Sequence, residues 1–66
     1  MDNFRYLVTK DIQFMNNHII PKGKSLRIRE FEDKTIVMYS SYKVFNLYSD
    51  EAKEHGKIID IRGFVE

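Results

Sequence analysis

Apolar and polar residues alternate along most of the chain, which is typical of strands that bury one face of a sheet. In the first alternating stretch, Phe4, Tyr6 and Val8 share one face. In the last, we expect Ile59 and Ile61 to point inward together. The alternation predicts strands over residues 4–9, 26–31, 35–39, 42–48 and 57–62.

The segment between the first two strands, residues 10–23, interrupts this pattern. We expect a long irregular excursion with a turn at Asn16-Asn17, since Asn tolerates positive φ. Pro21 has no N–H to give to a neighbouring strand. Ile19 and Ile20 are therefore expected to plug the core from an edge or loop position.

Short connections join the remaining strands. Residues 32–34 suit a hairpin, and Ser40-Ser41 a tight turn. Residues 49–56 carry the convincing helix signal: Ser49 suits the N-cap, and Gly56 suits a left-handed closing position. This helix is too short to be stable alone, so we expect a connector held by its neighbours.

The composition favours strands as well. The chain has eight Ile, four Val, five Phe and four Tyr, but three Leu and one Ala. Side chains that are β-branched or aromatic fit the pleated surface of a sheet. Sixty-six residues without cysteine make one small domain, 1–66, whose stability comes from packing or from oligomerisation. We predict an all-β protein.

The order of these elements resembles the small barrel of Src-homology-3-like domains. Residues 10–23 stand where that fold has its long first loop, and 49–56 where it has a short helical turn. The segment Lys22-Gly23-Lys24-Ser25-Leu26-Arg27-Ile28 resembles the stretch that leads into the second strand. The resemblance implies a five-stranded antiparallel barrel with one helical turn near 50–55. The alternative is an α+β mixed sheet with one packed helix.

The family's peptide-binding residues are not transferred to this chain. The sequence has no Trp, and residues 4–9 lack the Ala-Leu-Tyr-Asp-Tyr signature. Any binding surface therefore has to be identified from this chain's own residues.

Motifs for catalysis or cofactor binding fail on their spacing. Gly23-Lys24-Ser25 resembles the end of a phosphate-binding loop, but His18 stands where the first glycine belongs and strand-like alternation follows. Asp60 between two isoleucines is most simply solvent-facing. A barrel this small is filled by its own side chains, so we predict no enzyme, no catalytic residues and no cofactor.

Two histidines, His18 and His55, are the candidates for metal binding. Glu51 and His55 are four residues apart and share a helical face, which suits either a metal pair or an ion pair. His55 also suits a cation at the helix C-terminus. We predict no metal site.

A local basic stretch consists of Lys22, Lys24, Arg27 and Arg29, although the net charge is only +1. These cations suit contact with phosphates, and small barrels bind nucleic acid with stacked aromatics. In the simpler interpretation, the arginines are the solvent face of a strand, paired across the hairpin with acids such as Glu30, Glu32 or Asp33.

Tyr39, Tyr42 and Tyr48 are the candidates for protein binding, because Tyr combines a large rigid ring with a polar tip and is enriched at interfaces. In the simpler interpretation, two or three tyrosines complete a small core. The leading hypothesis is a non-enzymatic protein-interaction module, an accessory or inhibitory protein that occupies a partner's surface. An origin in a phage or mobile element is a guess from the chain's size.

Two other functions stay open: a nucleic-acid-binding barrel that uses the basic stretch, and a self-associating subunit such as a homodimer. No apolar run has the roughly 20 residues needed to span a bilayer, and the N-terminus lacks a secretory pattern. We therefore expect a cytoplasmic protein without membrane contact.

Overall fold

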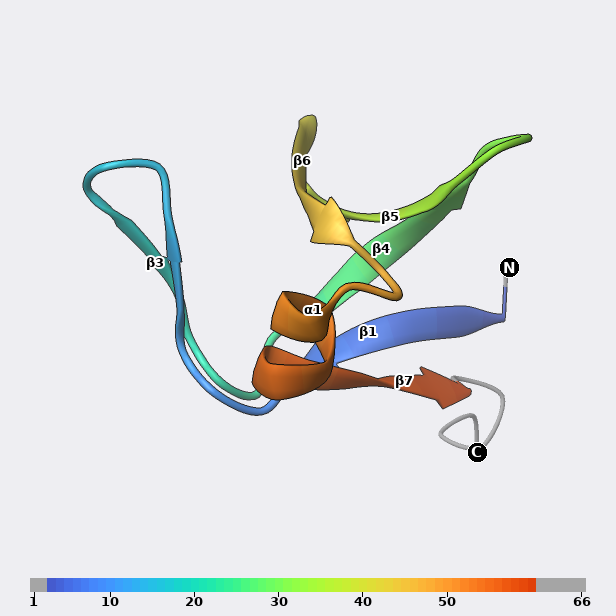
Figure 1. Cartoon of the computed structure of the whole chain (residues 1–66). Helices are drawn as coiled ribbons and strands as arrows, with labels where there is room; N and C mark the ends of the chain where they lie inside the picture. The colour runs from blue at the N-terminus through green and yellow to red at the C-terminus, as the bar shows by residue number, and fades with distance from the viewer. Residues whose placement is uncertain (1–2, 61–66) are drawn as a thin grey trace.

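The computed structural model describes residues 3–60, which form strands and one short helix (Figure 1). The elements are β1 (Phe4–Val8), β2 (Ile12–Phe14), β3 (His18–Ile20), β4 (Ser25–Glu30), β5 (Thr35–Tyr39), β6 (Tyr42–Asn46), α1 (Asp50–His55) and β7 (Gly56–Asp60). All five predicted strands are present, and the prediction of a mainly β chain is confirmed. The predicted inward position of Ile59 is wrong, because Ile59 pairs with Arg5 on the outer face of β1. Ile58 pairs instead with the buried Tyr6. The predicted inward position of Ile61 lies outside the described residues.

The main sheet has the strand order β6-β5-β4-β1-β7. Every pairing in residues 3–60 is antiparallel, so the mixed-sheet alternative is wrong for this part of the chain. β6 and β7 are the edges, and no closed barrel is formed over the described residues. In a closed barrel β6 and β7 would pair with each other. Here α1 contacts both edge strands and lies between them (Figure 1).

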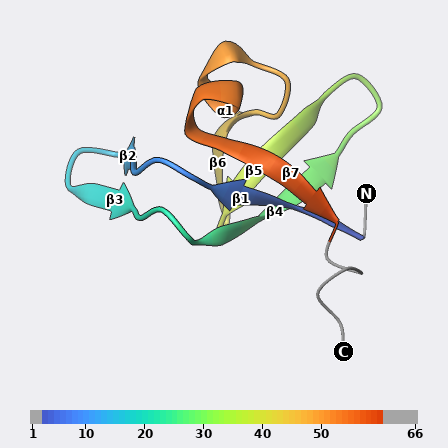
Figure 2. The ribbon, with the colours of Figure 1, turned by 90° about the horizontal axis from the view of Figure 1, so that it is seen from below.

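The segment expected to be irregular contains a second, two-stranded sheet. β2 and β3 pair with Ile12 opposite Ile20, and their hairpin extends to one side of the main sheet (Figure 2). Ile20 is fully buried, as expected, but Ile19 is 61% exposed. Neighbouring residues of a strand point to opposite faces, so only one of the two isoleucines reaches the core.

The core lies between the main sheet, the β2–β3 hairpin and α1. It consists of side chains that the alternation placed inward, together with residues from the excursion and the helix: Tyr6, Val8, Ile12, Ile20, Leu26, Val37, Phe45, Leu47 and Ala52. The Tyr6 ring meets Phe45 edge-to-face, with centroids 5.4 Å apart. Its hydroxyl donates a hydrogen bond of 2.6 Å to the Ala52 carbonyl. Tyr6 therefore joins the sheet to the helix.

Three residues within 3–60 have positive φ, and each lies in a turn. Gly23 (φ 95) leads into β4, and Ser40 (φ 56) is the first residue of the two-residue turn between β5 and β6. In the β2–β3 turn the positive φ belongs to Met15 (φ 59), not to the asparagine pair. The turn was predicted at the right place, but its left-handed residue was not.

The helix begins as predicted. The Ser49 hydroxyl accepts a hydrogen bond from the Ala52 N–H, which satisfies one of the free donors of the first turn. The left-handed close predicted at Gly56 is wrong, because its φ is −176 and its backbone is extended. A Cβ at this position would overlap the Leu7 carbonyl oxygen and the Tyr6 ring. Glycine is needed here because β1 approaches closely.

Candidate functional site

Aromatic side chains from two hairpins converge at one end of the molecule. Phe14 lies on β2, and its ring centroid is 5.8 Å from that of Tyr39 and 6.2 Å from that of Tyr42. His18 on β3 lies 5.4 Å from the Tyr39 ring, and its Nε2 is 3.1 Å from the Tyr39 hydroxyl. Two of the three predicted tyrosines are therefore brought together, with two partners that the sequence did not indicate.

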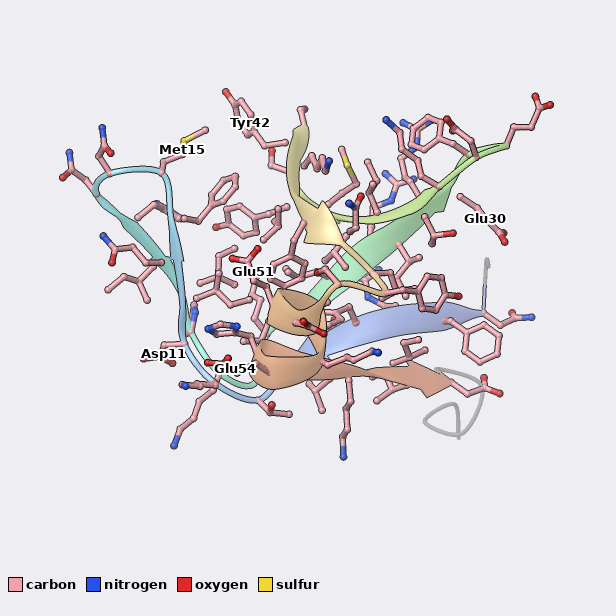
Figure 3. All side chains as sticks on the ribbon, viewed as in Figure 1. Asp11, Met15, Glu30, Tyr42, Glu51 and Glu54 are labelled. Atoms are coloured by element: carbon pink, nitrogen blue, oxygen red, sulfur yellow. The ribbon has the colours of Figure 1, made fainter. Side chains whose placement is uncertain are left out.

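These side chains surround an open hollow of about 310 Å³, here called the aromatic hollow. Its lining residues are Phe14, Met15, His18, Tyr39, Ser40 and Tyr42. Phe14 and Tyr39 pack partly against the core, whereas Met15 is 57% and Tyr42 54% exposed. Figure 3 shows Met15, at the tip of the hairpin, and Tyr42, at the start of β6, at the same end of the molecule. Fixed rings thus form the base of the hollow, and accessible side chains form its rim.

Both non-glycine residues with positive φ in residues 3–60, Met15 and Ser40, line this hollow. A left-handed conformation costs an L-residue roughly 1–2 kcal/mol. Backbone strain of this kind gathers at functional sites, where the surrounding structure holds it in place. Its position on both sides of the hollow is a second reason to select this site.

Tyr48 is not part of the aromatic hollow. It is 61% exposed and lies beside α1 and β7, where it lines a separate hollow with Tyr6, Lys57 and Ile58. Tyr6, the fourth tyrosine, is a core residue. The simpler interpretation, in which tyrosines complete the core, is correct for Tyr6, while Tyr39 is half-buried and Tyr42 and Tyr48 reach solvent.

Three cations line an open groove of about 600 Å³ next to the aromatic hollow: Arg5, Lys24 and Arg27. We call these residues the basic groove. Its lining contains no acidic side chain, and it shares Tyr39 and Ser40 with the aromatic hollow. Arg29 lies in an adjoining hollow with Arg27, whereas Lys22 lines neither. The structure therefore keeps three of the four predicted cations together and adds Arg5.

No acid stands directly across the hairpin from either Arg27 or Arg29. In the β4–β5 register, Arg27 stands opposite Met38 and Arg29 opposite Ile36. The Arg29 guanidinium lies 5.3 Å from the Phe31 ring centroid, and the Lys24 ammonium 6.0 Å from that of Tyr39. Cross-strand neighbours therefore do not neutralise the arginines.

Arg5 is held in place by β4. Its Nε donates to the Ser25 hydroxyl and its Nη2 to the Ser25 carbonyl, both at 3.1 Å. A guanidinium has five N–H donors, so three remain for other acceptors. Arg5 faces outward on β1, and only the pairing of β1 with β4 brings it to the basic stretch.

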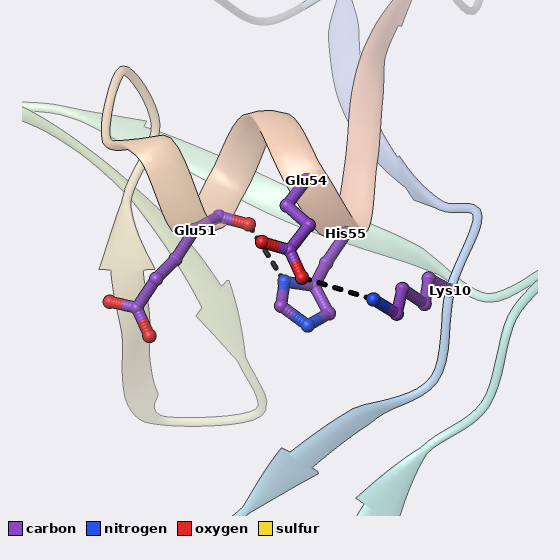
Figure 4. A network of polar contacts seen from close by, with 4 residues as sticks. All are labelled: Lys10, Glu51, Glu54 and His55. Carbon is purple, nitrogen blue, oxygen red and sulfur yellow. Dashed lines mark hydrogen bonds and ion pairs between the residues drawn. The ribbon is translucent and has the colours of Figure 1, made fainter.

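The remaining sequence candidates have structural roles. Gly23-Lys24-Ser25 is a turn that enters β4, and the Lys22 N–H is held by the Asp11 carboxylate at 2.8 Å. His55 Nδ1 donates to the Glu51 carbonyl at 2.9 Å, while the Glu51 carboxylate points away from it (Figure 4). In this structure the Glu51–His55 spacing therefore serves a side-chain-to-backbone hydrogen bond and not an ion pair. Nowhere in residues 3–60 do three potential metal-ligating side chains gather.

An exposed ion pair joins the excursion to the helix. The Lys10 ammonium lies 3.0 Å from the Glu54 carboxylate (Figure 4). This hydrogen bond and the charge of Lys10, with a smaller effect of His55, lower the pKa of Glu54. The pair is solvated on both sides, so it contributes little to stability.

Comparison with protein families, curated proteins and solved structures finds no match for this chain. No helix within residues 3–60 has the length and apolar character required to cross a bilayer. The aromatic hollow and the basic groove beside it therefore form the candidate site, selected on their geometry alone.

Proposed function

We propose that this chain is a non-enzymatic protein-interaction module that binds a partner protein through the aromatic hollow. The observation that supports the proposal is the convergence of Phe14 and His18 with Tyr39 and Tyr42 on an accessible surface. The contacting side chains come from two hairpins and are more than twenty residues apart in the sequence. Rings held against the core lose little entropy on binding, and they supply the apolar area that dominates interface energies.

The chemistry of the hollow favours recognition over catalysis. Its lining offers three aromatic rings, the His18 imidazole, a thioether and the hydroxyls of serine and tyrosine. It contains no carboxylate beside His18 that would orient the imidazole as a catalytic base. The exposed Met15 adds a flexible, polarisable contact of the kind used at adaptable binding surfaces. An accessory or inhibitory protein that acts by covering a partner's surface requires no more than this.

A relationship to Src-homology-3-like domains is part of the proposal. It is supported by the strand order β6-β5-β4-β1-β7 and by the long first connection, here the β2–β3 hairpin. In this view the chain is an open form of that layout, with α1 across the seam between β6 and β7.

The test compares two tyrosines of similar exposure, one inside the hollow and one outside. Tagged full-length protein and its Tyr42→Ala and Tyr48→Ala variants are used to capture partners from nuclease-treated lysate of the source cell, with quantitative mass spectrometry as the readout. We expect at least one protein to be lost with Tyr42→Ala and retained with Tyr48→Ala. A capture profile that is the same for both variants would contradict the proposal.

A further inference from the structure

We infer that the partner segment is an acidic peptide: an extended stretch that places an apolar side chain in the aromatic hollow and a carboxylate in the basic groove. This inference rests on the proposed function and adds the chemistry of the ligand. It follows from the contact between the two surfaces, which share Tyr39 and Ser40. An extended ligand that fills one of them and continues past Tyr39 therefore enters the other.

The charges of the groove favour carboxylates. Arg5, Lys24 and Arg27 all line it, without an acid among the lining residues. Arg5 is already oriented by Ser25, so part of the ordering cost of a guanidinium–carboxylate pair is met before the ligand arrives. Charge-assisted bonds from guanidinium groups to carboxylates are among the stronger hydrogen bonds in proteins.

The distance from a cation of the basic groove to the ring that both surfaces share indicates the spacing of the ligand's side chains. The Lys24 ammonium lies 6.0 Å from the Tyr39 ring centroid. In an extended chain, residues i and i+2 face the same side and are about 6.7 Å apart. We therefore expect the acid two residues from the apolar residue, in one direction or the other, with a further acid able to reach Arg27.

A peptide fits these charges better than a nucleic acid does. Nucleic-acid binding without sequence preference relies on many cations along the backbone, whereas the chain has a net charge of +1. Beyond Arg29 the β4–β5 connection carries the two acids Glu32 and Asp33 against one cation, Lys34, which disfavours a polyanion that continued along the hairpin. Three cations beside one apolar hollow match a short segment with one or two acids.

The test selects ligands without assuming a sequence. Random decapeptides displayed on phage are selected on the immobilised full chain, and enriched peptides are synthesised with a fluorescent label for anisotropy titrations. We expect enriched sequences to carry Asp or Glu two residues from an aliphatic or aromatic residue. Enrichment of neutral or basic peptides, or of none, would overturn the inference.

Charge-removing variants then test the groove itself. An exposed ion pair contributes roughly two- to fivefold in affinity, so the double variant Lys24→Gln, Arg27→Gln should bind the selected peptide about tenfold more weakly. Replacing the peptide's acids by their amides should have a similar effect. Lys22→Gln, an exposed cation outside the groove, is the matched control and should bind normally. An equal loss with Lys22→Gln would show general attraction and overturn the inference.

Two further measurements separate this inference from the proposed function. If neutral peptides bind, and lose affinity with Tyr42→Ala but not with Tyr48→Ala, the proposed function stands and the acidic ligand is refuted. If Tyr42→Ala and Tyr48→Ala bind every selected peptide equally, both fail. Oligothymidine serves as a nucleic-acid competitor of the selected peptide. If it displaces the peptide, and if its own binding is lost in the Lys24→Gln, Arg27→Gln variant, the groove binds nucleic acid and the inference is overturned.

Discussion

The change Tyr6→Phe removes one buried hydroxyl and leaves the ring against Phe45. The hydroxyl donates 2.6 Å to the Ala52 carbonyl, which also accepts the Gly56 N–H. The carbonyl therefore keeps a partner in the variant, and the cost is that of an ordinary net hydrogen bond, about 1 kcal/mol, not that of an orphaned group. In a domain of this size we expect Tm to fall by about 4–8 °C at neutral pH.

The same variant should become the more stable protein at high pH. Burial raises the pKa of Tyr6 from 10.0 to about 12. In the unfolded chain the phenol ionises at its ordinary pKa, whereas the folded protein holds it protonated. Stability is therefore complete below about pH 10 and is lost as the pH rises toward about 12, by roughly 3 kcal/mol in total. The loss reaches about 1 kcal/mol between about pH 10 and about pH 11, where the two stability curves should cross.

Urea unfolding followed by far-UV circular dichroism measures this difference for both proteins between about pH 7 and about pH 11. The remaining titrating groups are common to the two proteins and cancel in the difference. If the difference in unfolding free energy between the wild type and Tyr6→Phe stays constant over this pH range, the Tyr6 hydroxyl is not buried. Equal stability at neutral pH would show that its hydrogen bond to Ala52 is not formed.

Three further changes test other parts of the fold. Gly56→Ala forces a Cβ into the Tyr6 ring and the β1 backbone, so the free energy of unfolding should fall by about 3 kcal/mol; an unchanged urea midpoint would contradict the close approach. Ser40→Gly relieves a positive φ of 56 and should raise stability by about 0.5 kcal/mol, measured in the same way; a loss would contradict the turn geometry. Lys10→Met should raise the pKa of Glu54, measured by a ¹³C NMR titration of the side-chain carboxyls. In the wild type the ion pair is fully formed above the pKa of Glu54 and is lost as the pH falls through it. An unchanged pKa in the variant would rule out the ion pair.

The main sheet could be predicted from the sequence because its signal is local. Strand alternation shows which face of each segment is apolar, so the inward positions of Tyr6, Val8 and Leu47 needed no knowledge of the partner strands. The Ser49 N-cap is likewise a contact between residues three apart. Features that depend on residues close together in the sequence, such as these strands and this N-cap, could therefore be predicted.

The aromatic hollow could be predicted only in part, because its residues meet through tertiary packing. β2 and β3 have three residues each, too few for a clear alternation, and their turn depends on a methionine with positive φ. The contact of His18 with Tyr39 spans 21 residues of sequence. Phe14 carried a weak signal, its alternation with Ile12, but nothing in the sequence indicated which surface it faced.

The basic groove shows the same limit. Lys24 and Arg27 were found as neighbours in the sequence, whereas Arg5 reaches them only through the pairing of β1 with β4. The prediction placed acids across the hairpin from the arginines, but the residues directly opposite Arg27 and Arg29 are Met38 and Ile36. Register depends on turn geometry over the whole hairpin, which composition does not determine.

Site-specific photo-crosslinking tests most directly whether the aromatic hollow contacts a protein partner. p-Benzoylphenylalanine is placed at position 42, in the hollow, or at position 48, a tyrosine of similar exposure outside it, and the source cells are irradiated. We predict a covalent adduct with a protein from position 42 that is absent from position 48. Equal adducts from the two positions, or no protein adduct from position 42, would contradict the account.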